Sequence, residues 1–184
     1  MYTIACTGHR NSKIGGYSIN PTATYIYRWI AIQLIKLLQE HEQINCISGM
    51  AIGVDQIFAS VVNVIKQKYP EKIRLTCALP YENHGSNWPL ESQQYHQTIL
   101  SLADEVKVVS EGSYAIWKLL ERDRWMVDNC DLLLGVWNGD KSGGTYQTIK
   151  YAQSINKDII FINDKKLKAF INITNKLVEI YNGK

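Results

Sequence analysis

Several features that mark common protein classes are missing from this chain of 184 residues. None of its four cysteines belongs to a CxxC pair, and three lie in strand-like apolar runs, as buried free thiols do. No apolar run approaches the length of a membrane span. The amino terminus enters a strand at once instead of a basic and apolar leader. We therefore expect a cytoplasmic protein with no metal site, no cofactor and no membrane partner.

A strong excess of one charge is also missing. The formal net charge is +3, and the basic residues are scattered apart from a short cluster at 165–168, which we interpret as a solvated helix face. Proteins dedicated to nucleic acid usually concentrate their basic residues, so we do not expect nucleic acid as a partner. The chain also lacks HExxH, GxSxG, GxxxxGK[ST] and GxGxxG motifs, which leaves metal hydrolases, serine hydrolases and P-loop proteins without support.

What the sequence does contain is a regular alternation of strand and helix patterns. Hydrophobic residues make up 46% of the chain, enough for one ordinary domain over residues 1–184. The alternation predicts an α/β fold with a mostly parallel central sheet of about six strands. The first helix is expected to open at Asn20 and Pro21, a cap residue followed by proline. The strands are expected at 3–7, 44–47, 73–79, 106–109, 132–137 and 159–162.

Four glycine-bearing or polar loops each follow the carboxyl end of an expected strand. They cover residues 8–10, 48–53, 80–88 and 138–145. The carboxyl ends of parallel strands meet at one edge of a sheet, and ligands of open α/β sheets bind in the crevice along that edge. The sequence therefore predicts that these four loops form one site.

Three of the loops carry residues suited to a phosphate group, because glycine lets the backbone approach an anion closely. Arg10 could hold a phosphate, His9 could donate or exchange a proton, and Asp55 could accept a hydrogen bond from a ribose hydroxyl. Each has a plainer interpretation, such as turn geometry for the glycines, a helix cap for Thr145 or an acid at a helix start for Asp55. The backbone candidates are Gly8, Ser48, Gly49, Gly53, Gly143, Gly144 and Thr145.

Aromatic residues stand at the edges of the same loops. Tyr81, Trp88 and Trp137 could stack on a base, although packing at the rim of the core is the commoner role of such rings. Arg122 lies one helical turn before Met126 and projects with it.

Together these residues resemble the SLOG superfamily, which joins the DNA-processing protein A family to the Lonely Guy (LOG) proteins, and they look most like its YpsA branch. The resemblance covers the chain to about residue 160. It implies a Rossmann-like three-layer fold, a nucleotide or nucleotide-derived ligand and frequent dimers. The matching motifs are Thr7-Gly8-His9-Arg10, residues 48–55, Pro80-Tyr81 with Trp88, Arg122 with Met126, and Gly143-Gly144-Thr145.

LOG enzymes release a base from a nucleoside 5′-monophosphate, with an Arg-x3-Met helix followed by PGGxGTxxE. Arg122 and Met126 match the first part, and Gly143-Gly144-Thr145 matches the second loosely. Thr148 stands where the family has its catalytic glutamate and cannot replace a carboxylate. A catalytic acid would have to come from another loop. The candidate catalytic residues are therefore Glu82, Asp140 and Arg122.

Three hypotheses follow, and they leave open whether the chain is an enzyme. The first is binding of an ADP-ribose-like or cyclic nucleotide signal at the sheet edge, for sensing or sequestration. The second is N-glycosidic hydrolysis of nucleoside 5′-monophosphates. The third is binding of single-stranded DNA, against which the modest charge argues. The expected partner is a phosphorylated nucleoside or nucleotide-derived small molecule, held by a homo-oligomer, a dimer or larger.

Overall fold

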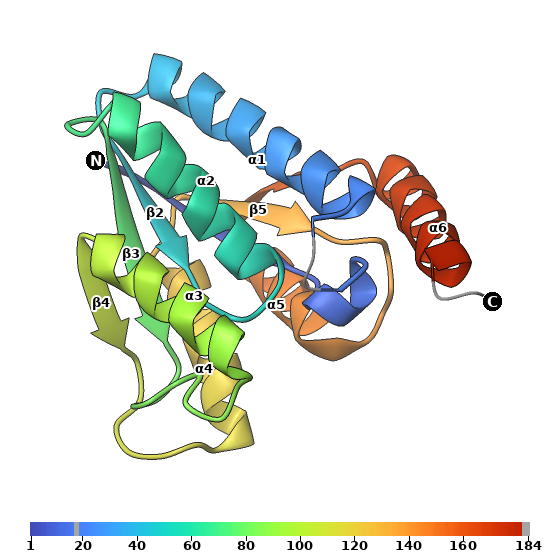
Figure 1. Ribbon diagram of the computed structural model, residues 1–184. Coiled ribbons are helices and arrows are strands. Elements are labelled where there is room, and N and C mark those ends of the chain that lie inside the picture. The colour runs from blue at the N-terminus through green and yellow to red at the C-terminus, as the bar shows by residue number, and fades with distance from the viewer. Residues whose placement is uncertain (17–18, 182–184) are drawn as a thin grey trace.

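A computed structural model of the chain, described here for residues 1–16 and 19–181, contains one parallel sheet with helices on both faces (Figure 1). The six strands lie in the order β4-β3-β2-β1-β5-β6, and every adjacent pair is parallel. This confirms the predicted α/β, Rossmann-like three-layer fold. The strands are β1 (Tyr2–Gly8), β2 (Ile44–Ser48), β3 (Ile73–Leu79), β4 (Glu105–Val108), β5 (Leu132–Val136) and β6 (Asp158–Phe161).

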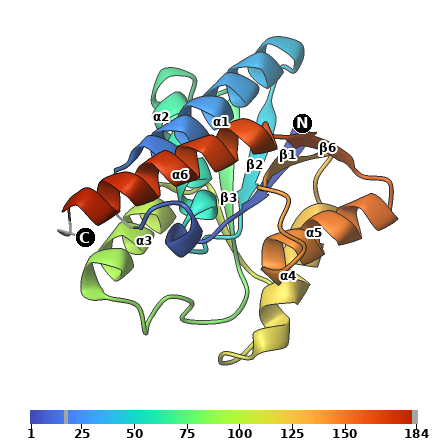
Figure 2. The same ribbon diagram turned by 90° about the vertical axis from the view of Figure 1, so that its right-hand side faces the viewer.

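The helices divide unequally between the two faces of the sheet (Figures 1 and 2). Helices α1, α2, α3 and α6 cover one face, where α1 packs on α2 and α6, and α2 packs on α3. Helices α4 and α5 pack on each other over the other face. The helices are α1 (Pro21–Glu40), α2 (Val54–Lys68), α3 (Leu90–Leu102), α4 (Ile116–Asp128), α5 (Gly143–Ser154) and α6 (Asp164–Tyr181), with a short 3₁₀ turn at Asn11–Lys13.

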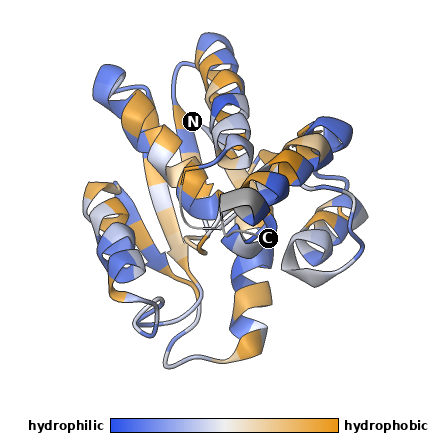
Figure 3. Ribbon diagram, turned by 45° about the vertical axis from the view of Figure 1, so that its right-hand side comes forward, coloured by the Kyte–Doolittle hydropathy of each residue, from blue (hydrophilic) through white to orange (hydrophobic). Residues whose placement is uncertain are grey.

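Alternation along the strands builds a separate core on each face. Ile4 and Cys6 of β1 face the larger core, where Phe58 of α2 is fully buried. Ala5 faces the smaller core, together with Met126 of α4. Figure 3 shows the matching pattern in the helices, which carry hydrophobic stripes toward the sheet and hydrophilic residues outside. Because both faces are covered, the central strands are mostly apolar.

The ends of two helices depend on local chemistry that can be compared with the sequence. Asn20 caps α1 as expected, accepting a hydrogen bond from the Ala23 N–H at 2.9 Å, with Pro21 at the first helical position. Helix α5, expected to begin at Thr145, instead begins at Gly143. The glycine pair is therefore the first turn of the helix rather than the end of a loop, and Thr145 is not its cap.

The direction of the chain across the sheet reverses between β1 and β5. From β1 the chain moves outward through β2, β3 and β4, then returns to place β5 on the other side of β1. In open α/β sheets a ligand usually binds at such a reversal, beside the loops that follow the two strands. Within residues 1–16 and 19–181, no helix is long and apolar enough to cross a membrane.

Candidate functional site

The loops after β1 and β5 are joined by two hydrogen bonds at the reversal point. The His9 Nε2 accepts from the Asn138 N–H at 3.1 Å, and the Thr145 hydroxyl donates to the Gly8 carbonyl at 2.9 Å. His9 is buried, which lowers its pKa and keeps the imidazole neutral. These bonds give His9 and Thr145 structural tasks. Their predicted roles toward a ligand remain predictions.

The loop after β2 is closed by contacts with the start of α2. The Ser48 hydroxyl donates to the Asp55 carbonyl at 2.8 Å and accepts from the Met50 N–H at 3.2 Å. The Asp55 carboxylate accepts from the Ala51 N–H at 3.2 Å. Gly53 adopts a φ of +123° where its backbone meets that of residues 9–11, a position with no room for a side chain. Ser48 thus shapes the loop from within.

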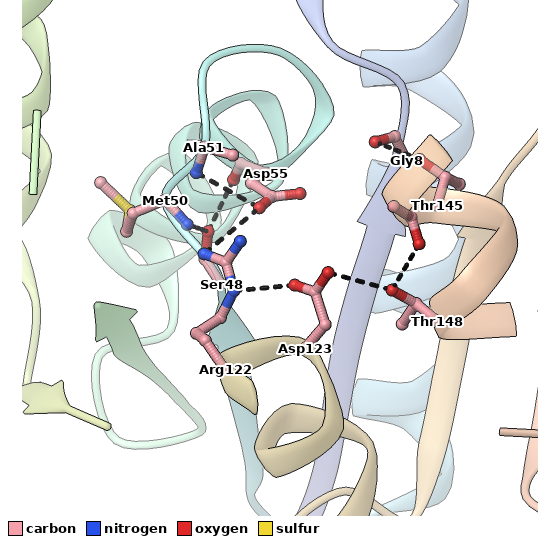
Figure 4. Close-up of polar contacts among 10 residues, drawn as sticks. Gly8, Ser48, Met50, Ala51, Asp55, Arg122, Asp123, Thr145 and Thr148 are labelled. Atoms are coloured by element: carbon pink, nitrogen blue, oxygen red, sulfur yellow. Dashed lines mark hydrogen bonds and ion pairs between the residues drawn. The ribbon is translucent and has the colours of Figure 1, made fainter. Parts of the chain in front are cut away.

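Arg122 reaches this loop from the opposite face of the sheet (Figure 4). Its Nε donates to the Asp123 carboxylate at 2.8 Å, and its Nη1 lies 4.0 Å from the Asp55 Oδ2. A Cβ on Gly49 would lie 2.5 Å from Nη1, so this glycine is what lets the guanidinium pass under the loop. Arg122 is only 2% exposed, and its Nη1 has no hydrogen-bond partner among the described residues.

The region under the loop after β2, called the crevice below, therefore holds one cation, Arg122, between two carboxylates, Asp55 and Asp123. Burial raises the pKa of Asp55 to about 6, an effect that the Arg122 charge opposes and the Asp123 charge reinforces. When both carboxylates are ionised, the net charge of this trio is −1. Arg122 is thus paired with carboxylates inside the protein, and its predicted role toward a ligand stays a prediction.

The sequence offered Glu82 and Asp140 as acids that could act together with Arg122, and among the described residues the structure pairs neither of them with it. Asp140 forms an ion pair with Lys13 at 3.2 Å, which lowers its pKa, and Glu82 lies in the loop after β3. Within the described part of the chain, neither is ion-paired with Arg122. The acid next to Arg122 is Asp123, whose second oxygen accepts from the Thr148 hydroxyl at 3.1 Å. The signal for Asp123 in the sequence was only its position beside Arg122.

A second feature of the same edge is a cavity of about 510 Å³ between the loops after β3 and β4. Three aromatic rings and several polar groups form its wall. Two of those rings, Tyr81 and Trp88, were predicted from the sequence, whereas Tyr114 carried no recognisable signal. The lining residues are Tyr81, Glu82, Asn83, Gly85, Ser86, Asn87, Trp88, Ser113 and Tyr114.

His84 lies behind this wall, in edge-on contact with Tyr81 and Trp88 at ring-centroid distances of 5.1 and 5.0 Å. It is 6% exposed, and neither ring nitrogen has a hydrogen-bond partner among the described residues. Burial lowers the pKa of His84 to about 3, with the Arg122 charge contributing. The imidazole is therefore neutral near pH 7. His96 continues the cluster 5.8 Å away.

Arg10 is the exposed cation between the crevice and the cavity. Its backbone pairs with Gly53, which fixes where the side chain starts. Burial raises the pKa of Tyr81, and the charges of Arg10 and Arg122 oppose that rise. The Arg10 charge also acts on Asp55 and His84. One exposed guanidinium is thus within electrostatic reach of both regions.

Comparison with protein families gives one match across most of the chain. The YpsA model, described as a YspA SLOG family, matches residues 4–167. A UPF0398 protein from Brevibacillus brevis is 26% identical over 182 residues, which cover 96% of this chain and 95% of the relative. The SPbeta prophage-derived protein YoqJ of Bacillus subtilis is 26% identical over 145 residues, 73% of this chain and 84% of YoqJ.

A solved structure of DNA processing protein A from Helicobacter pylori has a similar fold. It aligns with a TM-score of 0.59 and 14% identity, covering 97% of this chain and 80% of that one. At this identity the likeness shows a shared fold. The Helicobacter pylori protein is described as binding single-stranded DNA in a unique mode.

That neighbour overturns our prediction about partners. We expected a phosphorylated nucleoside or nucleotide-derived small molecule, a homo-oligomer and no nucleic acid. A protein of the same fold is described as binding single-stranded DNA, so excluding nucleic acid was wrong, and neither the small molecule nor the oligomer gains support. The error came from judging the whole chain by its net charge, which says nothing about a single arginine placed beside aromatic rings at one edge.

Proposed function

This chain belongs to the SLOG family, in its YpsA group, and from that premise we propose that it binds single-stranded nucleic acid along the carboxyl edge of its sheet. The neighbour in Helicobacter pylori, described as a single-stranded DNA binder with this fold, supports the proposal. Single-strand binding without sequence preference needs two kinds of group, cations for the phosphates and aromatic rings for the bases.

The observation that carries the proposal is the position of Arg10. Its guanidinium is exposed, its backbone is fixed by pairing with Gly53, and its charge reaches the Tyr81 ring at the cavity wall. A phosphate beside Arg10 would place the neighbouring bases near that wall. Arginine suits this task because its planar donor groups match two phosphate oxygens at once.

Exposed aromatic rings continue the surface beyond Tyr81. The Tyr114 ring packs edge-on against Tyr81 at 5.5 Å and is 59% exposed. Trp117, at the start of α4, is 56% exposed, and the Lys118 Nζ lies 5.6 Å from its ring centroid. Helix α4 projects beyond the sheet at the bottom of Figures 1 and 2, and hydrophobic residues colour its outer end in Figure 3. Such rings are suited to stacking on successive bases.

Arg122 has a different part in this proposal. It is buried and paired with Asp55 and Asp123, so we infer that it holds the loop after β2 and helix α4 together. Phosphate contacts then fall to Arg10 and to backbone N–H groups at the crevice. The helix start at Gly143 offers such groups.

The test is fluorescence anisotropy of a labelled oligo(dT) of about 15 nucleotides, titrated with protein at several salt concentrations. We expect binding that weakens with salt, because phosphate contacts release counterions. The Arg10→Ala variant should bind about tenfold more weakly, and its salt slope should fall by about 0.7, the value for one lost contact to a single strand.

The matched control is Arg28→Ala, which removes another exposed arginine, this one from α1 and away from the sheet edge. It should bind like the unmodified protein. Equal losses from the two variants would show a general effect of net charge and contradict the assigned role of Arg10. No binding of any oligonucleotide, at low salt and with high protein concentration, would refute the proposed function itself.

A further inference from the structure

We propose that the cavity between the loops after β3 and β4 takes one unstacked base of the bound strand and prefers a base with an exocyclic amino group over thymine. The inference rests on the proposed function and adds to it a specific contact. The size of the cavity, its aromatic walls and its polar lining groups each support the inference.

The cavity has the size and the chemistry of a base site. Its volume of about 510 Å³ accommodates a nucleobase with its sugar, and Tyr81, Trp88 and Tyr114 supply aromatic surface on its walls. A base leaving its stack loses contacts with its neighbours, and aromatic side chains replace them. A dedicated aromatic site is therefore better suited to an unstacked base than to the sugar or phosphate.

The walls are held in place before any ligand arrives. The Glu82 N–H donates to the Gly112 carbonyl at 3.3 Å, which ties the two cavity loops together. The Lys118 ammonium donates to the carbonyls of Glu111 and Ser113 at 2.5 and 2.7 Å, fixing the stretch that leads to Tyr114. Gly85 adopts a φ of +91° with the Trp88 ring close by, and a side chain there would press on that ring. Such preorganisation lowers the cost of binding.

His84 lies behind the wall, in contact with two of its rings and outside the residues that line the cavity. Its imidazole is buried and neutral, it touches the rings of Tyr81 and Trp88, and both nitrogens lack partners among the described residues. Because His84 is outside the lining, the polar contacts to a base fall to Glu82, Asn83 and Asn87.

The preference among bases follows from the polar lining. Glu82 is an acceptor when ionised, and the amides of Asn83 and Asn87 both donate and accept. Adenine and cytosine offer an amino donor beside a ring acceptor, a pair that a carboxylate and an amide can match. Thymine has no amino group. The Glu82 carboxylate is thus the group expected to separate the two kinds of base.

The experiment compares oligo(dT) of about 15 nucleotides with the same strand carrying a single central dA, dC or abasic position. The unmodified protein should bind the dA and dC strands on the order of tenfold more tightly than oligo(dT), because a hydrogen bond to a charged group is gained. The abasic strand should bind like oligo(dT), since a thymine elsewhere in it can fill the site. Equal affinity for all four strands would overturn the inference while leaving strand binding, and so the proposed function, intact.

Two variants with matched controls locate the effect. Glu82→Gln keeps the size of the side chain and should remove the preference for dA and dC over dT, whereas Glu91→Gln, an equal charge change on α3, should keep it. Tyr114→Ala should weaken all strands, and Tyr95→Ala, an exposed tyrosine on α3, should not. A preference that persists in Glu82→Gln would overturn the assigned selectivity, and unchanged binding by Tyr114→Ala would overturn the aromatic contact.

Discussion

In the crevice, one buried guanidinium lies between two carboxylates, whereas behind the wall of the neighbouring cavity a buried neutral imidazole lies among aromatic rings. In the crevice the charge of Arg122 is paired with carboxylates of the protein itself, and Arg122 is almost wholly buried. The cavity keeps an open volume, and the His84 imidazole behind its wall has no hydrogen-bond partner among the described residues. The comparison indicates that the crevice, the most highly charged part of the site, has a structural role. The part suited to a ligand is lined by aromatic rings, amides and one carboxylate, Glu82, and it lies within electrostatic reach of the exposed Arg10.

The largest expected effect comes from breaking the charge balance of the crevice. Arg122→Met leaves the buried Asp55 and the partly buried Asp123 without their cation, which should lower the free energy of unfolding by about 3–5 kcal/mol. Urea denaturation followed by circular dichroism measures this. Arg124→Met, an exposed arginine on the same helix, should change stability by less than about 1 kcal/mol. Similar small losses in both variants would contradict a structural role for Arg122.

A smaller effect separates the two regions by the sign of their pH dependence. Asp55 has a raised pKa of about 6, so the folded state binds its proton more tightly and stability falls as pH rises from about 4 to 6. His84 has a lowered pKa of about 3, so stability is lost as pH falls from about 6.5 toward 3. The two trends oppose each other between pH 4 and 6, and each is on the order of 2 kcal/mol.

Substitutions should expose each trend in turn. Relative to the unmodified protein, Asp55→Asn should make stability rise more steeply with pH over that range, and His84→Phe should make it fall. Urea midpoints at several pH values test both, with His41→Gln, a histidine at the end of α1 on the far edge, as control. Changes of the same sign in Asp55→Asn and His84→Phe would show that the two regions do not differ in this way.

The smallest predicted effect concerns the bond that connects α5 to the crevice. The Thr148 hydroxyl donates to Asp123 and lies 2.9 Å from the Gly144 carbonyl. Thr148→Val should cost about 1 kcal/mol, because the Asp123 oxygen loses its donor. Thr98→Val removes a hydroxyl that bonds the carbonyl one turn before it, at Gln94, and should be nearly neutral. Equal losses of stability from Thr148→Val and Thr98→Val in thermal unfolding would show that the hydrogen bond to Asp123 does not stabilise the fold.

The sequence predicted the fold well, because its signals are local. Apolar runs of strand length, Asn20 followed by Pro21, and the alternation of elements each depend on residues close together in the chain. The start of α5 was missed because Gly143 and Gly144 favour a loop by propensity. In the fold, the helix continues to residues whose packing against α4 and the sheet outweighs that preference.

The site was predictable where it depends on strand ends and not where it depends on tertiary neighbours. Loops at carboxyl ends of parallel strands must meet, and this brought Arg10, Gly49 and Tyr81 to one edge. Nothing local reveals that Asp123 would bridge Arg122 and Thr148, or that Tyr114, from the loop after β4, would complete a cavity with Trp88. The Asp123–Thr148 bond and the pairing of Tyr114 with Trp88 join residues far apart in the sequence, and a single chain carries no direct signal for them.

The most direct measurement of the central claim is photochemical cross-linking of an oligo(dT) strand that carries one 5-iodocytosine, followed by peptide mass spectrometry. If single strands bind along the carboxyl edge with an amino-bearing base in the cavity, the cross-link will form at Tyr81, Trp88 or Tyr114 and will disappear with an excess of unlabelled strand. Cross-links confined to the opposite edge of the sheet, or none that compete with unlabelled strand, would contradict it.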